Sequence, residues 1–277
     1  MWLVVLGIGS VQIGAGIAKN LFDDADPLTL VWLRLATSAV VLAALVRPTL
    51  RGRTPEDWRV AIAFGVVLGT MNWAIYESFA RIPLGIAVTI EFLGPLGLAV
   101  AGSRRARDLV WVALAAVGVG LLGAERGDLN AAGVGFALLA AVAWTAYILL
   151  SAGTGRRWPG LDGLTVASIV ATVGMAPFLV AFSGRGLGEP NVVLLGALVG
   201  LLSSVIPYSC EITALRTIRP SVFAILMSLE PAAAALAGML VVHEFLSAVQ
   251  WLAIGCVILA SVGATRTESR LAAPVPD

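Results

Sequence analysis

Ten long apolar runs follow one another along this chain of 277 residues, with only short polar segments between them. They occupy about residues 2–18, 28–46, 58–79, 83–101, 108–124, 131–150, 161–182, 191–213, 220–242 and 246–264. A helix needs about 20 residues to cross the hydrocarbon core of a bilayer, and the runs are close to that length. Because they are continuous and do not alternate with polar residues, they predict helices and not barrel strands. The sequence therefore predicts an all-α membrane protein with ten transmembrane helices.

The composition excludes several other classes of protein. Only 13% of the residues are charged and 59% are hydrophobic, whereas soluble domains are roughly 25% charged. The net charge of +1 gives no basis for nucleic-acid binding, which needs clustered Lys and Arg. With one histidine, no metal-ligand motif and no nucleophile elbow, we expect neither an enzyme nor a metal or cofactor site. Cys210 and Cys256 fall inside runs, where a thiol usually serves as a small apolar filler.

The distribution of positive charge predicts the orientation of the chain. With the N-terminus in the cytoplasm, the inner loops and the C-terminal tail hold 13 of the 18 Lys and Arg, and the outer loops hold 4. The positive-inside rule then places both termini in the cytoplasm. The first run has no basic region before it and no clear small-residue cleavage site, so we predict that it is retained as a helix.

A polar segment at residues 123–128 divides the ten runs into two sets of five. Because five is an odd number, the second set must cross the membrane in the opposite direction to the first. We therefore predict two inverted five-helix repeats, over residues 1–125 and 128–266, followed by a short cytoplasmic tail over residues 267–277.

Two glutamates lie deep inside apolar runs and close to a proline, Glu91 in the fourth run and Glu230 in the ninth. An ionisable group at that depth is unfavourable and marks a functional site by default. Counted from Pro83 and Pro220 at 1.5 Å per residue, the two lie about 12 and 15 Å into a core of ~30 Å. The two runs enter from opposite sides, so both acids reach the midplane, where inverted-repeat carriers bind their substrates. The pair predicts a transporter.

Prolines accompany both acids. Pro95 has no N–H to donate to the carbonyl of Glu91, and Pro231 likewise frees the carbonyl of Met227, so we predict a helix break at each. A freed carbonyl beside a carboxylate suits an ammonium group or a proton relay. The alternative is a proline kink packed against a neighbouring helix, with a protonated glutamate satisfying the carbonyl. We favour the functional interpretation because the arrangement occurs twice.

Arg34 is the one cation that we expect well inside a span. Leaving it unpaired costs at least about 2.5–3.5 kcal/mol, so it needs an anionic partner or a water-filled cavity. Candidate partners are Glu77, Glu91 and a substrate carboxylate. The alternatives are a structural salt bridge and a side chain that extends to the outer membrane surface.

Other polar side chains in the runs are further candidates for the same site. Asn72 and Tyr76 are four residues apart and share one helix face. Glu77 lies four residues before Arg81, a spacing that equally favours a local ion pair. Further candidates are Tyr208, Glu211, Ser203, Gln12, Trp144 and Tyr147. Aromatic residues near span ends more often anchor the membrane surface.

Two segments resemble a known transporter family. The run from Arg81 to Leu96, RIPLGIAVTIEFLGPL, is similar to the drug/metabolite transporter superfamily. It is most similar to the EamA-type exporters of the threonine/homoserine branch, often called RhtA-like. The run from Ile218 to Ala232, IRPSVFAILMSLEPA, resembles the matching part of the second EamA repeat.

The resemblance covers nearly the whole chain and implies a bacterial inner-membrane exporter of small neutral amino acids that exchanges its substrate for protons. It also implies that the third, fourth, eighth and ninth spans line a central cavity. The family often has Gly-Glu near the end of the ninth span, whereas His243 precedes Glu244 here. That departure leaves a role for Glu244 open.

We therefore expect a secondary transporter that exports threonine, homoserine or related metabolites by proton antiport and alternating access. Glu91 and Glu230 would share proton coupling and recognition of the ammonium group, and Arg34 would be a partner either for the substrate carboxylate or for a charge of the protein. The alternative is the same fold with a drug, a nucleoside or another metabolite as cargo. The expected partners are the small-molecule substrate, protons and the lipid bilayer.

Overall fold

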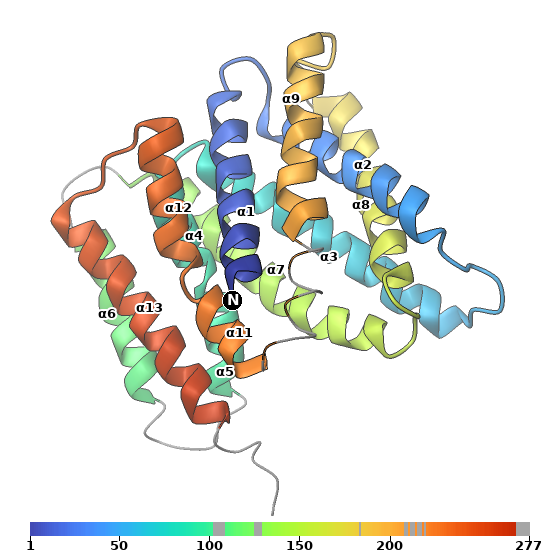
Figure 1. The fold of residues 1–277 in the computed structure, drawn as a ribbon. Coiled ribbons are helices and arrows are strands. Elements are labelled where there is room, and N and C mark those ends of the chain that lie inside the picture. The colour runs from blue at the N-terminus through green and yellow to red at the C-terminus, as the bar shows by residue number, and fades with distance from the viewer. Residues whose placement is uncertain are drawn as a thin grey trace, which may run out of the picture.

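The structure is a computed structural model that describes residues 1–101, 109–124, 129–182, 184–207, 210, 214, 218 and 220–269 (Figure 1). All regular elements in these residues are helices, as predicted. They are α1 Trp2–Asn20, α2 Pro27–Val46, α3 Pro55–Phe79, α4 Leu84–Glu91, α5 Leu93–Ala101, α6 Leu109–Ala124, α7 Ala131–Gly155, α8 Asp162–Phe182, α9 Pro190–Gly200, the π-helix η2 Leu201–Val205, α11 Pro220–Met227, α12 Glu230–Ala237, the π-helix η3 Gly238–Val242 and α13 Ala248–Ser269.

Eight segments of the described chain are long and apolar enough to cross a membrane. They are Trp2–Asn20, Pro27–Val46, Pro55–Phe79, Leu84–Ala101, Ala131–Gly155, Asp162–Phe182, Val222–Val242 and Ala248–Thr265. Two further apolar helices, Leu109–Leu122 and Pro190–Val205, are shorter and correspond to the predicted runs 108–124 and 191–213. The prediction of a helical membrane protein is thus confirmed, with eight helices of full spanning length among the described residues.

Local signals explain where several helices begin. Thr54 and Asp57 form a capping box at the start of α3, each accepting a hydrogen bond from the other's backbone N–H. Asn130 caps α7 by accepting a hydrogen bond from the Gly133 N–H. Proline occupies the first turn of α2, α3 and α9, where its missing N–H costs nothing. Polar caps thus fix the ends of otherwise uniformly apolar helices.

Both helices that carry the predicted acids are interrupted beside them. α4 ends at Glu91 and α5 begins at Leu93, while α11 ends at Met227 and α12 begins at Glu230. Pro95 and Pro231 each lie in the first turn of the helix that follows the interruption. Proline is tolerated there because a helix's first N–H groups have no intrahelical partner.

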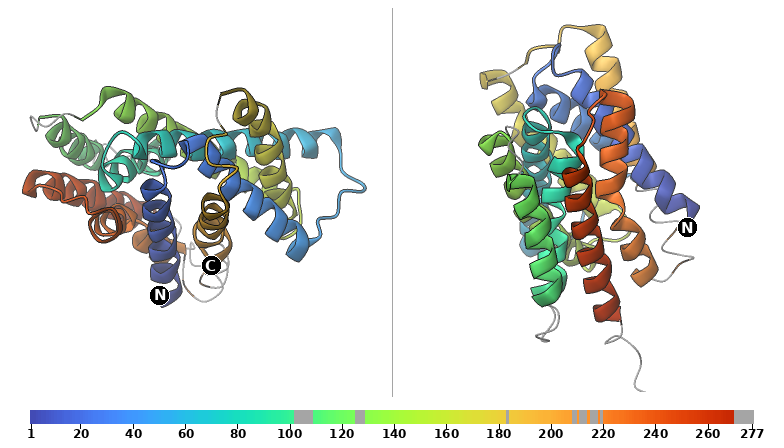
Figure 2. Two further views of the ribbon diagram at one scale, coloured as in Figure 1. Left: turned by 90° about the horizontal axis from the view of Figure 1, so that it is seen from above. Right: turned by 90° about the vertical axis from the view of Figure 1, so that its left-hand side faces the viewer.

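Most helix packing crosses the predicted division near residue 125. α3 packs against α7 and α8, α2 against α8 and α9, α4 against α12, and α6 against α13. In Figure 1, α6 and α13 lie side by side at the left, α2, α3 and α8 lie at the right, and α1 lies between the two groups. Figure 2 shows the α6–α13 pair from its own side. The two halves of the chain are therefore joined along an extensive interface.

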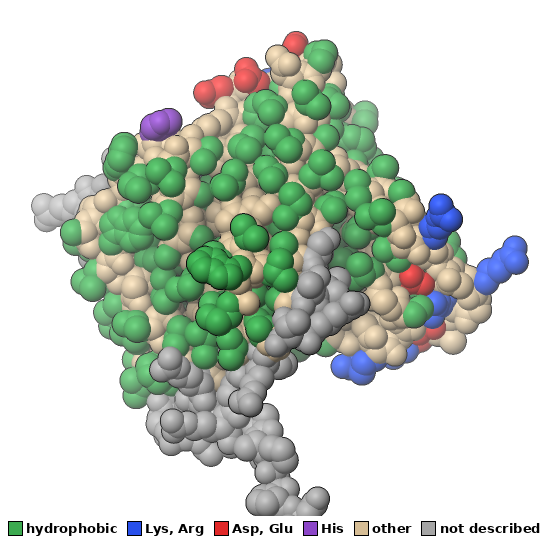
Figure 3. All heavy atoms as spheres, in the orientation of Figure 1, with side chains coloured by type: hydrophobic (Ala, Val, Ile, Leu, Met, Phe, Trp, Pro, Cys, Tyr) green, Lys and Arg blue, Asp and Glu red, His purple; other side chains and the backbone are tan. Residues whose placement is uncertain are grey.

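The outer surface is apolar over a wide area. Phe182 and Val180 are more than four-fifths exposed, at 81% and 85%, and large apolar side chains of many other helices are also exposed. On the face in Figure 3, hydrophobic side chains spread over the middle, acidic side chains stand out at the top, and Lys and Arg gather at the lower right. Such a surface suits contact with lipid along the middle and with water at the ends.

Candidate functional site

A cavity of about 190 Å³ lies among α1, α2, α3, α4, α7, η2, α11 and α12. A single water needs only roughly 10–15 Å³, so the cavity has room for several waters or a small ligand. Its polar and aromatic lining consists of Gln12, Arg34, Asn72, Phe79, Glu91, Trp144, Tyr147, Ser203 and Glu230. Apolar side chains, including Val88 and Met227, complete the wall. The cavity thus gathers ionisable groups of both signs inside an apolar bundle.

The two acids reach this cavity because α4 and α12 cross closely in opposite directions. A Cβ added at Gly85 of α4 would lie 2.6 Å from the Cα of Ala235, so only glycine permits this approach. Gly238, at the far end of α12, lies beside Leu84 at the start of α4, which makes the two helices antiparallel. Six residues forward from Gly85 lead to Glu91, and five residues back from Ala235 lead to Glu230. Both carboxylates therefore arrive at a similar depth.

The environments of the two acids differ. Glu230 is buried, with 7% of its surface exposed, and it is the first residue of α12, where the partial positive charge of a helix N-terminus favours an anion. Glu91 is half-buried and is the last residue of α4, with a single residue between it and the start of α5. Glu230 is therefore the more deeply buried of the two acids, and it is the one that begins a helix.

Arg34 provides the positive charge of the cavity wall. Its Nη2 donates a hydrogen bond to the Ser203 carbonyl at 3.1 Å, and its Cζ lies 5.7 Å from the centre of the Tyr76 ring. Its Nε is buried and has no hydrogen-bond partner among the described residues. The guanidinium is therefore held in place by two neighbours and keeps one donor for another group.

Asn72 and Tyr76 share a face of α3 but have different surroundings. Asn72 lines the cavity, and its Nδ2 donates to the Leu68 carbonyl at 2.8 Å. Tyr76 is completely buried, lies outside the lining, and packs between the rings of Phe22 and Phe79. Tyr76 thus does not reach the cavity itself but contacts Arg34, whose guanidinium lies over its ring.

Several other candidates do not reach the cavity. Glu77 forms an ion pair with Arg81 at the end of α3, which is the local pairing that the four-residue spacing also favoured. The cavity lining includes Glu91 and Glu230 but neither of the nearby prolines, Pro95 and Pro231. Tyr208 and Glu211 lie outside the described residues. Cys210 and Cys256 are free thiols, and no group of three or more metal-ligating side chains occurs in the described part of the chain.

A second polar cluster, which we call the Lys19 clamp, was not predicted. It consists of Lys19, Glu244 and the backbone of Ile82 and Leu84. Lys19 pairs with Glu244 and donates to the Ile82 carbonyl at 2.7 Å, and Glu244 accepts from the Leu84 N–H at 2.9 Å. The clamp thereby joins α1, the start of α4 and the segment after η3. The sequence signal was available, since Lys19 is the only lysine in the chain.

The clamp lies one helical turn beyond the cavity. On α1, Ala15 lines the cavity and Lys19 follows four residues later on the same face. On α4, Val88 lines the cavity and Leu84 precedes it by four residues. His243 adopts a left-handed backbone conformation with φ of 63°, and the Glu244 N–H bonds back to the Gly238 carbonyl at 3.0 Å. This turn directs the Glu244 carboxylate towards Lys19 and Leu84.

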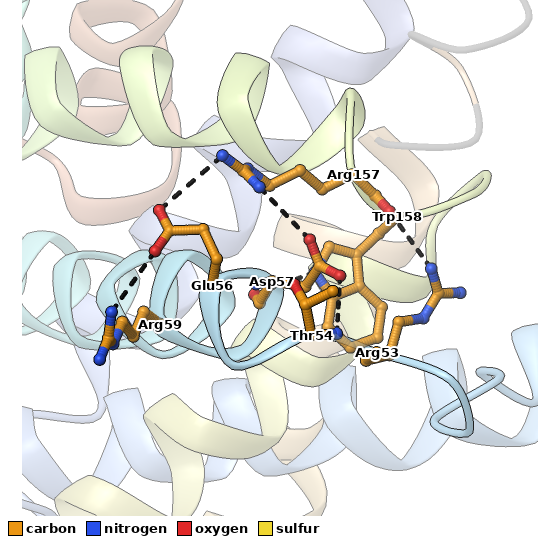
Figure 4. A network of polar contacts seen from close by, with 7 residues as sticks. All are labelled: Arg53, Thr54, Glu56, Asp57, Arg59, Arg157 and Trp158. Carbon is orange, nitrogen blue, oxygen red and sulfur yellow. Dashed lines mark hydrogen bonds and ion pairs between the residues drawn. The ribbon is translucent and has the colours of Figure 1, made fainter.

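A third cluster lies at the other end of α3, around its first turn (Figure 4). Arg157, two residues after α7, pairs with Asp57 and Glu56, and the Trp158 indole donates to the Asp57 carbonyl at 3.2 Å. Arg53 donates to the Arg157 carbonyl at 3.2 Å. These contacts fix α3 to the α7–α8 connection, away from the cavity.

Comparisons with known proteins agree with this architecture. Residues 131–266 match the model of the EamA-like transporter family. The chain is 38% identical over 276 residues to the "Threonine/homoserine exporter RhtA" of Escherichia coli strain K12, covering 97% of this chain and 93% of that protein. It is 37% identical over 281 residues to the exporter of the same name from Salmonella typhimurium strain LT2, covering 98% and 94%.

A solved crystal structure shares the fold with a TM-score of 0.66 at 18% identity, covering 98% of this chain and 99% of the other. The similarity to this structure concerns the fold alone, whereas the identity to the curated exporters extends over nearly their full length. The chain belongs to the EamA-like transporter family.

Proposed function

We propose that this protein is a secondary transporter that exports small neutral amino acids of the threonine and homoserine type by proton antiport. The observation that carries the proposal is the cavity, which presents two carboxylates and one guanidinium to the same small volume. A zwitterionic amino acid has the complementary pair of charges. The names of the related exporters point to the same class of substrate.

The positions of the charged side chains in the cavity suggest how a bound amino acid is oriented. Its ammonium group faces Glu91 and Glu230, and its carboxylate faces Arg34. Arg34 suits this role because a guanidinium can donate two parallel hydrogen bonds to a carboxylate. A cavity of about 190 Å³ with three charged groups also favours a small zwitterion over a large apolar drug.

Proton exchange is assigned chiefly to Glu91. Glu91 is half-buried and lines the cavity inside an apolar span, where a charged carboxylate is unfavourable unless a cation lies near it. It can take up a proton when the substrate ammonium leaves, and release it when the next ammonium arrives. Glu230, at a helix N-terminus, then serves mainly as a fixed negative charge.

The proposed architecture is ten transmembrane helices in two inverted repeats, over residues 1–125 and 128–266, with a tail over 267–277. The two shorter apolar helices Leu109–Leu122 and Pro190–Val205 would complete the ten spans. The interruption of one helix in each half beside an acid supports the repeat, as does the packing of α4 on α12. Discontinuous helices at the interface of inverted repeats are typical of carrier substrate sites.

In an alternating-access cycle, the Lys19 clamp would act as a gate at one end of the substrate path. The clamp bridges the proposed repeats one turn beyond the cavity, so it closes that end of the substrate path. With both termini in the cytoplasm, this is the outer end. Opening it would release the substrate outside a bacterial inner membrane. The acidic side chains at the top of Figure 3 and the basic ones at its lower right agree with this orientation.

Counterflow in proteoliposomes tests the proposed function. Purified protein would be reconstituted with unlabelled threonine inside, and uptake of labelled threonine or homoserine would be followed with and without a pH gradient. We expect saturable exchange that the gradient accelerates. Flux of cationic dyes or nucleosides without amino-acid exchange would assign another cargo, and no flux of any solute would overturn the transporter proposal.

A further inference from the structure

Two uncharged side chains of the cavity have no role in binding the charged groups of an amino acid. Gln12 of α1 and Ser203 of η2 both line the cavity, and each is only 4% exposed. The Gln12 Oε1 and the Ser203 Oγ have no hydrogen-bond partner among the described residues. A buried polar atom without a hydrogen-bond partner is unfavourable. A polar group of a bound ligand would supply the missing hydrogen bond to each atom.

The two elements that carry these side chains are fixed against each other. The Ser10 hydroxyl of α1 donates to the Leu202 carbonyl of η2 at 2.6 Å. Gly14 lies directly beside the Ser203 hydroxyl, and a Cβ at that position would collide with it. The Arg34 guanidinium is bonded to the Ser203 carbonyl, so it approaches the same residue from α2. These contacts hold η2 against the Ser10 and Gly14 face of α1, while Gln12 enters the cavity from another face of the same helix. Gln12, Ser203 and Arg34 thus face the same small cavity from three elements that pack together.

The hydrogen-bonding properties of Gln12 and Ser203 indicate which ligand group can bind them. The Gln12 Oε1 can only accept a hydrogen bond, while the Ser203 hydroxyl can donate or accept. An aliphatic alcohol has the chemistry that both atoms require, because its O–H can donate to the Gln12 Oε1 and its oxygen can accept from the Ser203 hydroxyl. A methyl group in the same place would leave both protein atoms unpaired. A second carboxylate could not donate to Gln12 and would place a second negative charge near Glu91 and Glu230.

We propose that Gln12 and Ser203 form a subsite that recognises the side-chain hydroxyl of the transported amino acid. The inference rests on the proposed function and refines it, because it selects hydroxyl-bearing amino acids from the class of small neutral ones. Sites built to bond a hydroxyl discriminate strongly against analogues that lack it.

Matched pairs of amino acids test the subsite. Valine has the shape of threonine with a methyl in place of the hydroxyl, and norvaline has the same relation to homoserine. Exchange of labelled threonine in proteoliposomes would be inhibited by each unlabelled amino acid, and the inhibition constants would be compared. We expect the amino acid with the hydroxyl to bind about tenfold more tightly, or better, within each pair. The hydroxyl forms a buried hydrogen bond, whereas the methyl analogue leaves the protein's polar atoms without a partner.

Two variants test whether the preference for the hydroxyl depends on Gln12 and Ser203. Gln12→Met keeps the length of the side chain without its polar atoms, and Ser203→Ala removes only the hydroxyl. In both we expect the threonine-to-valine preference to fall towards equality. The ratio is measured within each variant, so it does not depend on the amount of folded protein. Ser204→Ala is the matched control, because Ser204 is the next residue, is also buried, and does not line the cavity.

The outcomes separate the subsite from the proposed function. If wild-type protein exchanges threonine but binds valine equally well, the subsite is wrong and the exporter proposal stands. A wild-type preference for threonine that survives both Gln12→Met and Ser203→Ala also overturns the subsite. If no amino acid is exchanged at all, both proposals fall together.

Discussion

Lys19 and Glu244 are 225 residues apart in the chain, yet their side chains form an ion pair that joins α1 to the segment after η3. Both side chains are largely shielded from solvent, with 13% and 21% of their surfaces exposed. The same carboxylate accepts a hydrogen bond from the first residue of α4. One acid thus connects three elements.

We predict that Glu244→Gln exposes the cavity to the outer side. The probe is Ala15→Cys, a cavity-lining position one turn below Lys19, in protein whose Cys210 and Cys256 are replaced by serine. A membrane-impermeant maleimide added to intact cells should label this cysteine several-fold faster in the Glu244→Gln variant. Glu189→Gln is the control, because Glu189 is exposed and distant in sequence from the clamp. Equal labelling in all three proteins would show that the clamp does not control access.

Much of this fold was predictable because helix geometry is regular. Ten apolar runs of nearly constant length indicate helices, and the rise of 1.5 Å per residue placed Glu91 and Glu230 at a similar depth. The structure brings both to one cavity with Arg34 and Asn72. The pairing of Glu77 with Arg81 was predictable as an alternative for the same reason, since residues four apart are neighbours on any helix.

The remaining features depend on contacts between distant segments. The partner of Lys19 cannot be found from local spacing, because it is set by the turn at His243 and by the packing of α1 on α12 and η3. Ser203 was among the candidates, but the sequence did not indicate that it lies in a π-helix, whose wider turn changes which side chains share a face. Apolar periodicity does not reveal such a turn in a helix that is apolar on all sides.

We predict that Glu91→Gln separates amino-acid exchange from the pH gradient. Glutamine keeps the size of the side chain but cannot release a proton, so threonine exchange should persist while its acceleration by the gradient disappears. Counterflow in proteoliposomes with and without a gradient measures both. Glu56→Gln makes the same chemical change in the ionic cluster of Figure 4 and should leave the acceleration intact. Unchanged coupling in Glu91→Gln would remove this residue from the proton path.

We predict that Gly85→Ala destabilises the protein by about 1–3 kcal/mol, as expected when a methyl group is forced into a packed interface. The new Cβ would lie 2.6 Å from the Ala235 backbone and would push α4 away from α12. Thermal unfolding in detergent should show a lower midpoint and weaker threonine exchange. Gly97→Ala is the matched control in α5, because a Cβ there meets no atom within 4 Å. A similar midpoint for both variants would mean that the α4–α12 crossing adapts readily.

We predict that Arg34→Lys raises the KM for threonine by about tenfold, the effect of losing one well-placed hydrogen bond to a charged group. Lysine keeps the positive charge, but its compact ammonium cannot at once reach the Ser203 carbonyl, lie flat over the Tyr76 ring and offer a free N–H to a carboxylate. Tyr76→Phe is the control for the ring contact. The Tyr76 hydroxyl is buried without a partner among the described residues, so its removal should leave the KM near the wild-type value. If Arg34→Lys transports with an unchanged KM, a point charge suffices and the guanidinium does not bind the carboxylate through paired hydrogen bonds.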